Sequence, residues 1–151
     1  MAAASDDGPR VFVRRTAKAP KRTAIFKRAV LGTLARAAPD VRGDVTLVLT
    51  GDAAVRRLNR RYRGSDRTTD VLSFELSSGD RPGEPFGDIV VSVDAARRQA
   101  RAYGVTAHDE ILRLIVHGAL HLCGHDHHER RAAARMHGLT RRLLKRLRAD
   151  G

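Results

Sequence analysis

The chain has 151 residues, of which 42% are hydrophobic and 30% are charged. This length suits one domain and is short for two, and the composition is typical of a soluble globular protein rather than a disordered or membrane-spanning one. The sequence contains no apolar run near the roughly 20 residues of a membrane helix, and the N-terminus reads as neither a secretion signal nor a transit peptide. We therefore expect one domain over residues 1–151, flexible at 1–8, in the cytoplasm.

The formal net charge is +12, with 29 Lys and Arg against 17 Asp and Glu. An excess of this size favours a polyanionic partner, and nucleic acid is the first choice. An arginine-rich proteome would explain why arginine replaces lysine on solvated faces, but it leaves the surplus of positive charge unexplained. The single cysteine, Cys123, excludes an internal disulfide framework and is consistent with a reducing compartment.

The apolar periodicity predicts about four strands and five helices around one core. Short β-branched or alternating runs predict strands at residues 11–13, 44–50, 71–74 and 89–93. Amphipathic or apolar stretches with capping residues predict helices at about residues 23–34, 52–62, 94–103, 106–122 and 129–147. Asp94 is the expected N-cap of the third helix, and Thr106 with Asp109 forms a capping box for the fourth. The expected fold class is α+β, with a mixed sheet of about four strands.

Five of the seven histidines lie within residues 117–128. His117 and His121 are four residues apart, so on a helix their side chains point within about 40° of each other. Gly124 can end that helix in the left-handed conformation and bring His127 back toward the pair. The spacing H-x-x-x-H-x-x-G-x-x-H is that of a three-histidine zinc site with an open fourth position. We predict one zinc ion per chain at the end of this central buried helix, although nickel, cobalt or copper would also bind three imidazoles.

Other residues around the histidines have less specific interpretations. Cys123 lies about 240° round the helix from His117, so we expect it to fill apolar space and not to reach the metal. Asp126 either orients a ligand imidazole or serves as a turn residue. His125 and His128 donate to a ligand, contact substrate or are solvated loop residues, and we favour the last.

The residue after the first histidine distinguishes two kinds of hydrolase. Metzincin proteases share the histidine spacing but have Glu there as general base. Here it is Gly118, and a general base typically contributes about 10²–10⁴-fold to the rate. Phosphodiester cleavage instead needs a metal that polarises a phosphoryl oxygen and a guanidinium that grips the phosphate. Residues 58–74 concentrate cations and hydroxyl groups, either for that purpose or as a solvated basic turn.

Three sequence blocks resemble the YbeY family of bacterial endoribonucleases and rRNA maturation factors. Residues 117–127 (HGALHLCGHDH) resemble its HGxLHLxGYDH signature, residues 58–74 (LNRRYRGSDRTTDVLSF) resemble LNxxYRxxDxxTDVLSF, and residues 87–90 (GDIV) resemble GDIxIS. The blocks occur in family order and, with the elements between them, cover about residues 44 to 130. The visible departure is His125, where the family usually has tyrosine.

The resemblance implies that His117, His121 and His127 bind zinc and that Arg63 is the catalytic arginine near the metal. It also implies single-strand-selective cleavage of RNA, in maturation of the 16S rRNA precursor at its 3′ end and in ribosome quality control. The implied partners are the small ribosomal subunit and an Era-type GTPase, with no membrane.

Two alternatives stay open beside the nuclease: a metzincin-like metallopeptidase and a non-catalytic, zinc-stabilised ribosome-assembly factor. Residues that would support the ligands or contact substrate are Asp126, His125, Asp88 and Ser73. The sequence does not rank a general base among Asp88, Asp126 and Glu129.

Overall fold

The computed structural model describes residues 7–66, 69–124 and 130–150. Within these ranges the chain forms four strands and five helices. In chain order they are β1 (Val11–Arg15), α1 (Ala24–Ala37), β2 (Asp44–Thr50), α2 (Asp52–Arg63), β3 (Val71–Glu75), β4 (Pro85–Ser92), α3 (Val93–Tyr103), α4 (Ala107–Leu122) and α5 (Arg130–Asp150). The segment 1–6, most of the stretch predicted to be flexible, lies outside the described residues.

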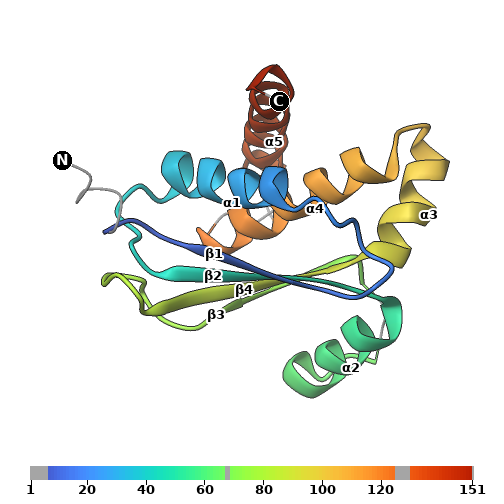
Figure 1. Ribbon diagram of the computed structural model, residues 1–151, viewed down its shortest axis with the longest axis horizontal. Coiled ribbons are helices and arrows are strands. Elements are labelled where there is room, and N and C mark those ends of the chain that lie inside the picture. Colours follow the sequence, from blue (N-terminus) through green and yellow to red (C-terminus); the bar gives the residue numbers. More distant parts are fainter. Residues whose placement is uncertain (1–6, 67–68, 125–129, 151) are drawn as a thin grey trace.

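The four strands form one mixed sheet in the order β1-β2-β4-β3 (Figure 1). β2 pairs in parallel with both β1 and β4, whereas β3 runs antiparallel to β4 and forms one edge of the sheet. The predicted α+β fold with a four-stranded mixed sheet and five helices is therefore confirmed.

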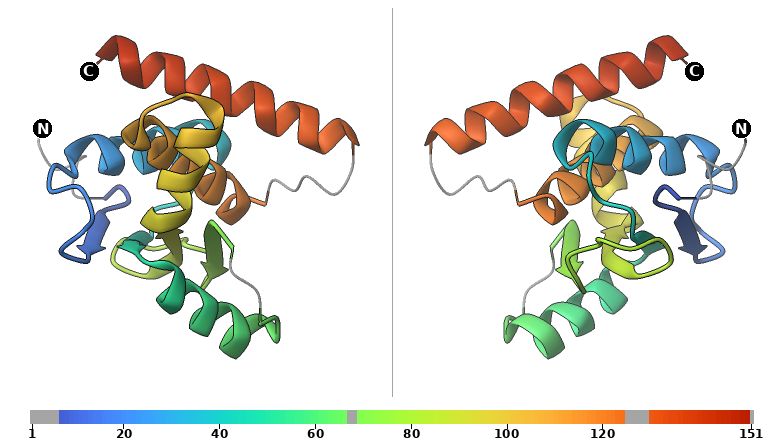
Figure 2. Two further views of the ribbon diagram at one scale, coloured as in Figure 1. Left: turned by 90° about the vertical axis from the view of Figure 1, so that its right-hand side faces the viewer. Right: turned by 90° about the vertical axis from the view of Figure 1, so that its left-hand side faces the viewer.

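The helices lie in layers about this sheet. α1 and α4 cover one face, and α2 lies on the opposite side (Figure 1). α5 crosses over α1 and α4 on their outer side (Figure 2). α4 thus lies between the sheet and α5. Apolar residues cover most of its circumference, as the sequence predicts for a largely buried helix.

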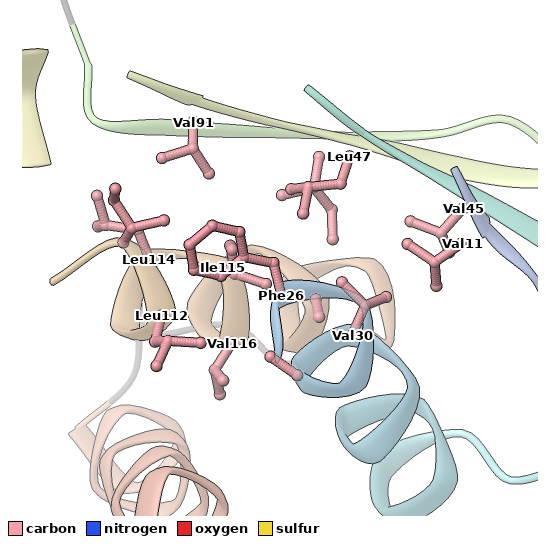
Figure 3. Packing of buried hydrophobic residues seen from close by; sticks show 14 of the residues in the cluster. Val11, Phe26, Val30, Val45, Leu47, Val91, Leu112, Leu114, Ile115 and Val116 are labelled. Carbon is pink, nitrogen blue, oxygen red and sulfur yellow. The ribbon is translucent and has the colours of Figure 1, made fainter. Parts of the chain in front are cut away.

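The main core lies between the sheet and the pair α1 and α4 (Figure 3). Alternate residues of the strands point into it, as the period of two of a β-strand requires. Its labelled members in Figure 3 are Val11, Phe26, Val30, Val45, Leu47, Val91, Leu112, Leu114, Ile115 and Val116. Leu143 and Leu147 of α5 close the core from outside, and Leu139 is partly buried against it. A second, smaller cluster (Val55, Leu72 and Val90) packs under α2.

Two of the differences from the predicted elements have a clear cause in the structure. β4 begins at Pro85 rather than Ile89, because residues that read as loop in the sequence pair with β2 and β3. Ser92 rather than Asp94 caps α3: its hydroxyl accepts a 3.1 Å hydrogen bond from a backbone N–H in the first turn. Asp94 instead accepts a 2.9 Å hydrogen bond from the backbone N–H of Asp52, at the start of α2. Serine and aspartate both cap helices well. The contact between Asp94 and the start of α2 leaves Ser92 as the cap of α3.

In the described part of the chain, no helix has both the length and the apolar character needed to cross a bilayer.

Candidate active site

The central feature of the site is a pair of imidazoles on α4. Thr106 starts this helix as predicted, with its hydroxyl accepting a 3.1 Å hydrogen bond from the backbone N–H of Asp109. Near the other end, His117 and His121 are half-buried and their Nε2 atoms lie 3.1 Å apart. Tetrahedral zinc with Zn–N distances of about 2.0–2.1 Å separates two ligand nitrogens by roughly 3.3–3.4 Å. The histidine pair, His117 and His121, therefore fits one shared ion with little adjustment.

The chain turns directly after the histidine pair. Gly124 has φ +88°, the left-handed conformation predicted from the sequence, and its N–H donates a 3.0 Å hydrogen bond to the carbonyl of His121. The predicted third ligand, His127, lies outside the described residues. The same holds for the other residues predicted in this loop, His125, Asp126, His128 and Glu129.

Gly118 explains how α4 approaches the sheet so closely. A Cβ at this position would lie 2.7 Å from Cγ2 of Ile89, closer than real Cβ contacts, and 3.0 Å from Cγ2 of Val71, tighter than most of them. Glycine is therefore needed for the helix to lie against β3 and β4. A glutamate here would direct its side chain into the sheet, so this position does not accommodate the general base of a metzincin protease.

A serine connects α4 to Arg63. Ser73 on β3 donates a 2.7 Å hydrogen bond from its hydroxyl to the backbone carbonyl of Gly118, next to His117. The carbonyl of Ser73 in turn accepts a 2.7 Å hydrogen bond from Nη2 of Arg63, the last residue of α2. Ser73 was predicted as a candidate to support ligands or contact substrate, and here it positions both the histidine helix and the arginine.

The described part of the basic segment predicted at residues 58–74 comprises the end of α2, the turn at residues 64–66, residues 69–70 and β3. Gly64, with φ +68°, ends α2 in the left-handed conformation. Arg56 forms two hydrogen bonds of 2.9 and 3.1 Å with the carboxylate of Asp66, which ties the turn back to the helix. Asp66 is thus paired with an arginine from outside the segment, whereas the guanidinium of Arg63 within the segment is held at the edge strand β3.

The structure does not bring Asp88 to the histidine pair. Its neighbours on β4, Gly87 and Ile89, both face α4, so Asp88 between them points to the opposite face of the sheet. Burial raises the pKa of the Asp88 carboxyl, an effect that the charge of Arg14 opposes. Asp88 therefore occupies the wrong face of the sheet for the ligand-supporting or general-base role considered for it.

Cys123 packs partly buried against the main core, as predicted. Burial raises the pKa of its thiol to about 11, so the thiol stays protonated at neutral pH.

Sequence reasoning did not single out the contact between Tyr62 and Phe74. Their ring centroids lie 5.5 Å apart in an edge-to-face arrangement, at the end of α2 and on β3. The signal in the sequence was the alternation of β3, which places Leu72 and Phe74 on the same face and therefore under α2.

Comparison with known proteins identifies the family. The family model described as Endoribonuclease YbeY matches residues 14–148. A protein of Rhodospirillum rubrum named Endoribonuclease YbeY is 38% identical over 138 residues, covering 83% of this chain and 69% of the relative. The protein of that name from Anaeromyxobacter sp. is 40% identical over 137 residues, covering 91% and 68%.

The share of the relative that is matched varies. The Endoribonuclease YbeY of Myxococcus xanthus is 48% identical over 104 residues, which are 67% of this chain but only 35% of the relative. Among solved structures, the solution structure of TM1509 from Thermotoga maritima superposes with a TM-score of 0.65 at 27% identity, covering 93% of this chain and 90% of that one. With the family match extending over nearly the whole chain, the protein belongs to the YbeY endoribonuclease family.

Proposed function

We propose that this protein is a zinc-dependent endoribonuclease that cleaves single-stranded RNA, with the metal held by His117, His121 and His127. The observation that carries the proposal is the 3.1 Å approach of two Nε2 atoms on α4, and Ser73 connects Arg63 to the same helix. Membership of a family whose relatives are named endoribonucleases supports RNA as the substrate. The net charge of +12 supports a polyanionic substrate independently.

The residues of the site divide the work of phosphodiester cleavage. A bound zinc ion would supply Lewis acidity and positive charge at the phosphoryl group. The imidazoles of the histidine pair supply two of its ligands, and His127 supplies the third. Arg63 binds a non-bridging phosphate oxygen through its remaining N–H groups, while its bond to the Ser73 carbonyl holds the guanidinium in place. The hydroxyl of Ser73 keeps that strand in register with the histidine helix.

The biological substrate that the family resemblance implies is the 16S rRNA precursor at its 3′ end. We place the protein in rRNA maturation and ribosome quality control in the cytoplasm, with the small ribosomal subunit and an Era-type GTPase as partners. The peptidase alternative is disfavoured by the packing of Gly118, which leaves no room for a catalytic glutamate. A non-catalytic assembly factor would use the same ligands, so it is separated from the nuclease by assay.

The test incubates the purified protein with single-stranded RNA and with casein, each with and without a chelator. We expect the RNA to be cut and casein to stay intact, the chelator to stop cleavage, and added zinc to restore it. His121→Ala and Arg63→Ala should abolish cleavage. The matched controls are His137→Ala and Arg101→Ala, which change exposed residues of α5 and α3 and should cleave like the wild type.

Three results would contradict the proposal. RNA cleavage that survives both His121→Ala and Arg63→Ala would indicate a contaminating nuclease. RNA that is bound but never cut, with or without zinc, would favour the non-catalytic assembly factor. Cleavage of casein would favour the metallopeptidase over the nuclease.

A further inference from the structure

Tyr62 and Phe74 form an exposed aromatic pair between two arginines. The ring of Tyr62, on the last turn of α2, is 60% exposed, and it meets the half-buried ring of Phe74 edge to face with centroids 5.5 Å apart. Cζ of Arg61 lies 5.4 Å from the ring centroid of Tyr62, and Cζ of Arg63 lies 5.6 Å from that of Phe74. One arginine thus flanks each ring of the aromatic pair, and we call this surface the aromatic ladder (Arg61, Tyr62, Phe74 and Arg63).

The aromatic ladder is held rigidly from below. Phe74 packs against the small cluster of Val55, Leu72 and Val90 under α2, so its ring is anchored while that of Tyr62 stays at the surface. An exposed tyrosine ring leaves apolar surface in contact with water, which is unfavourable, and it does not stabilise the core. Tyr103, the other tyrosine of the chain, is similarly exposed at 64%, but within the described residues it contacts no other aromatic ring.

Phe12, another exposed aromatic residue, differs from Tyr62 in the charges around it. It lies on β1, at the other edge of the sheet from β3, and is 48% exposed under the guanidinium of Arg10. Arg10 is neutralised there by Asp44, with a 3.0 Å ion pair. The arginines of the aromatic ladder form no ion pair with a described carboxylate, so they are available to phosphate.

Arg63 connects the aromatic ladder to the candidate active site. Its guanidinium lies over the ring of Phe74 and also donates to the carbonyl of Ser73, whose hydroxyl bonds to the helix that carries the histidine pair. Arg63 is therefore linked to the aromatic pair through Phe74 and to the histidine helix through Ser73. Arg57, Arg60 and Arg61 line a surface hollow along α2, which continues the positive charge beyond the aromatic pair.

We propose that Tyr62, supported by Phe74, is the stacking site for one unpaired base of the RNA, in the nucleotide next to the phosphate held by Arg63. This inference rests on the proposed function and adds the structural origin of its preference for single strands. Aromatic side chains stack on bases of any sequence, and arginines beside them neutralise the backbone. Tyr62 can stack only on a base that has one face free of neighbouring bases. Bases in the interior of a duplex are stacked on both faces, so they cannot bind at this site.

The test measures binding without cleavage, so that it does not depend on the chemistry. Wild type, Tyr62→Ala and Tyr62→Phe are titrated by fluorescence anisotropy, in the presence of chelator, with a short single-stranded RNA. A matching series of RNAs carries one abasic ribose at successive positions. Tyr103→Ala is the matched control, because it removes an equally exposed tyrosine at the far end of α3. Thermal unfolding confirms that each variant is folded.

Tyr62→Ala should weaken binding of the intact RNA by about 5- to 150-fold, the usual range for loss of one stacked base. Tyr62→Phe and Tyr103→Ala should bind like the wild type. An abasic ribose at one position should weaken wild-type binding by a similar factor. The same RNA should bind Tyr62→Ala as tightly as the intact RNA does, because the stacking partner of that base is already absent. Affinity for duplex RNA should change little.

Two outcomes would overturn the stacking site: Tyr62→Ala binding as tightly as the wild type, or the abasic penalty persisting in Tyr62→Ala at every position. A wild-type protein with no affinity for single-stranded RNA would also overturn it. The cleavage assay with Arg63→Ala and His121→Ala decides the proposed function separately, since a protein that cuts RNA without stacking on Tyr62 passes that assay and fails this one.

Discussion

Replacing Gly118 by alanine tests whether α4 lies directly on the edge of the sheet. The new Cβ would start 2.7 Å from Ile89 Cγ2 and has to retreat to at least 3.4 Å for ordinary contact. Overpacking of this kind costs about 1–3 kcal/mol, whereas alanine in place of glycine gains roughly 0.5–1 kcal/mol within a helix. The net expectation for Gly118→Ala is a loss of roughly 0–2.5 kcal/mol, which corresponds to a Tm lower by up to roughly 10 °C for a chain of this size.

Gly32→Ala in α1 is the matched control. A Cβ at this position meets nothing within 4 Å, so the helix propensity acts alone and should raise Tm by roughly 1–4 °C. Both variants are measured by thermal unfolding under one set of conditions, and the difference between them isolates the clash. If Gly118→Ala melts at or above Gly32→Ala, the close packing of α4 on β3 and β4 is wrong.

Three further predictions concern the neighbouring residues. Ser73→Ala removes the bond to the Gly118 carbonyl and should destabilise the protein by about 0.5–1.5 kcal/mol, and an unchanged urea midpoint would contradict this. Arg63→Lys keeps the charge but loses the planar fork, so kcat/KM for RNA should fall by about ten-fold or more at unchanged metal content; a rate like that of the wild type would show that charge alone suffices. Burial raises the pKa of Asp88, because the charged carboxylate is less stable in the folded protein than in the unfolded chain. The charged form therefore lowers the free energy of unfolding at pH values above the raised pKa, and this loss disappears below the unfolded pKa of about 3.9. Asp88→Asn should therefore melt at a higher temperature than the wild type at pH 7, with the gap closing as the pH falls below about 4; a gap that widens toward acid would refute the sign.

The parts of the fold that follow from local pattern could be predicted from the sequence. α4 combines a Thr106 cap, continuous apolar residues and a terminal glycine, and each of these signals acts within a few residues. The placement of His117 and His121 on one face follows from helix periodicity for the same reason.

The remaining features depend on contacts between distant segments. The hydroxyl of Ser73 meets Gly118, 45 residues further along the chain, and no local pattern encodes that pairing. The face on which Asp88 lies follows from alternation only after it is known which face α4 covers. Ser92 and Asp94 are both good caps, and Asp52, brought in from α2, decides their roles.

The most direct test of the metal site is the metal content of the purified protein, measured by elemental analysis beside its RNA-cleaving activity. We expect close to one zinc per chain in the wild type, a strong loss of metal and of cleavage together in His117→Ala and His121→Ala, and wild-type content in His137→Ala. A wild-type protein that cleaves RNA while holding no transition metal, or variants of the histidine pair that keep their full metal content, would contradict this account.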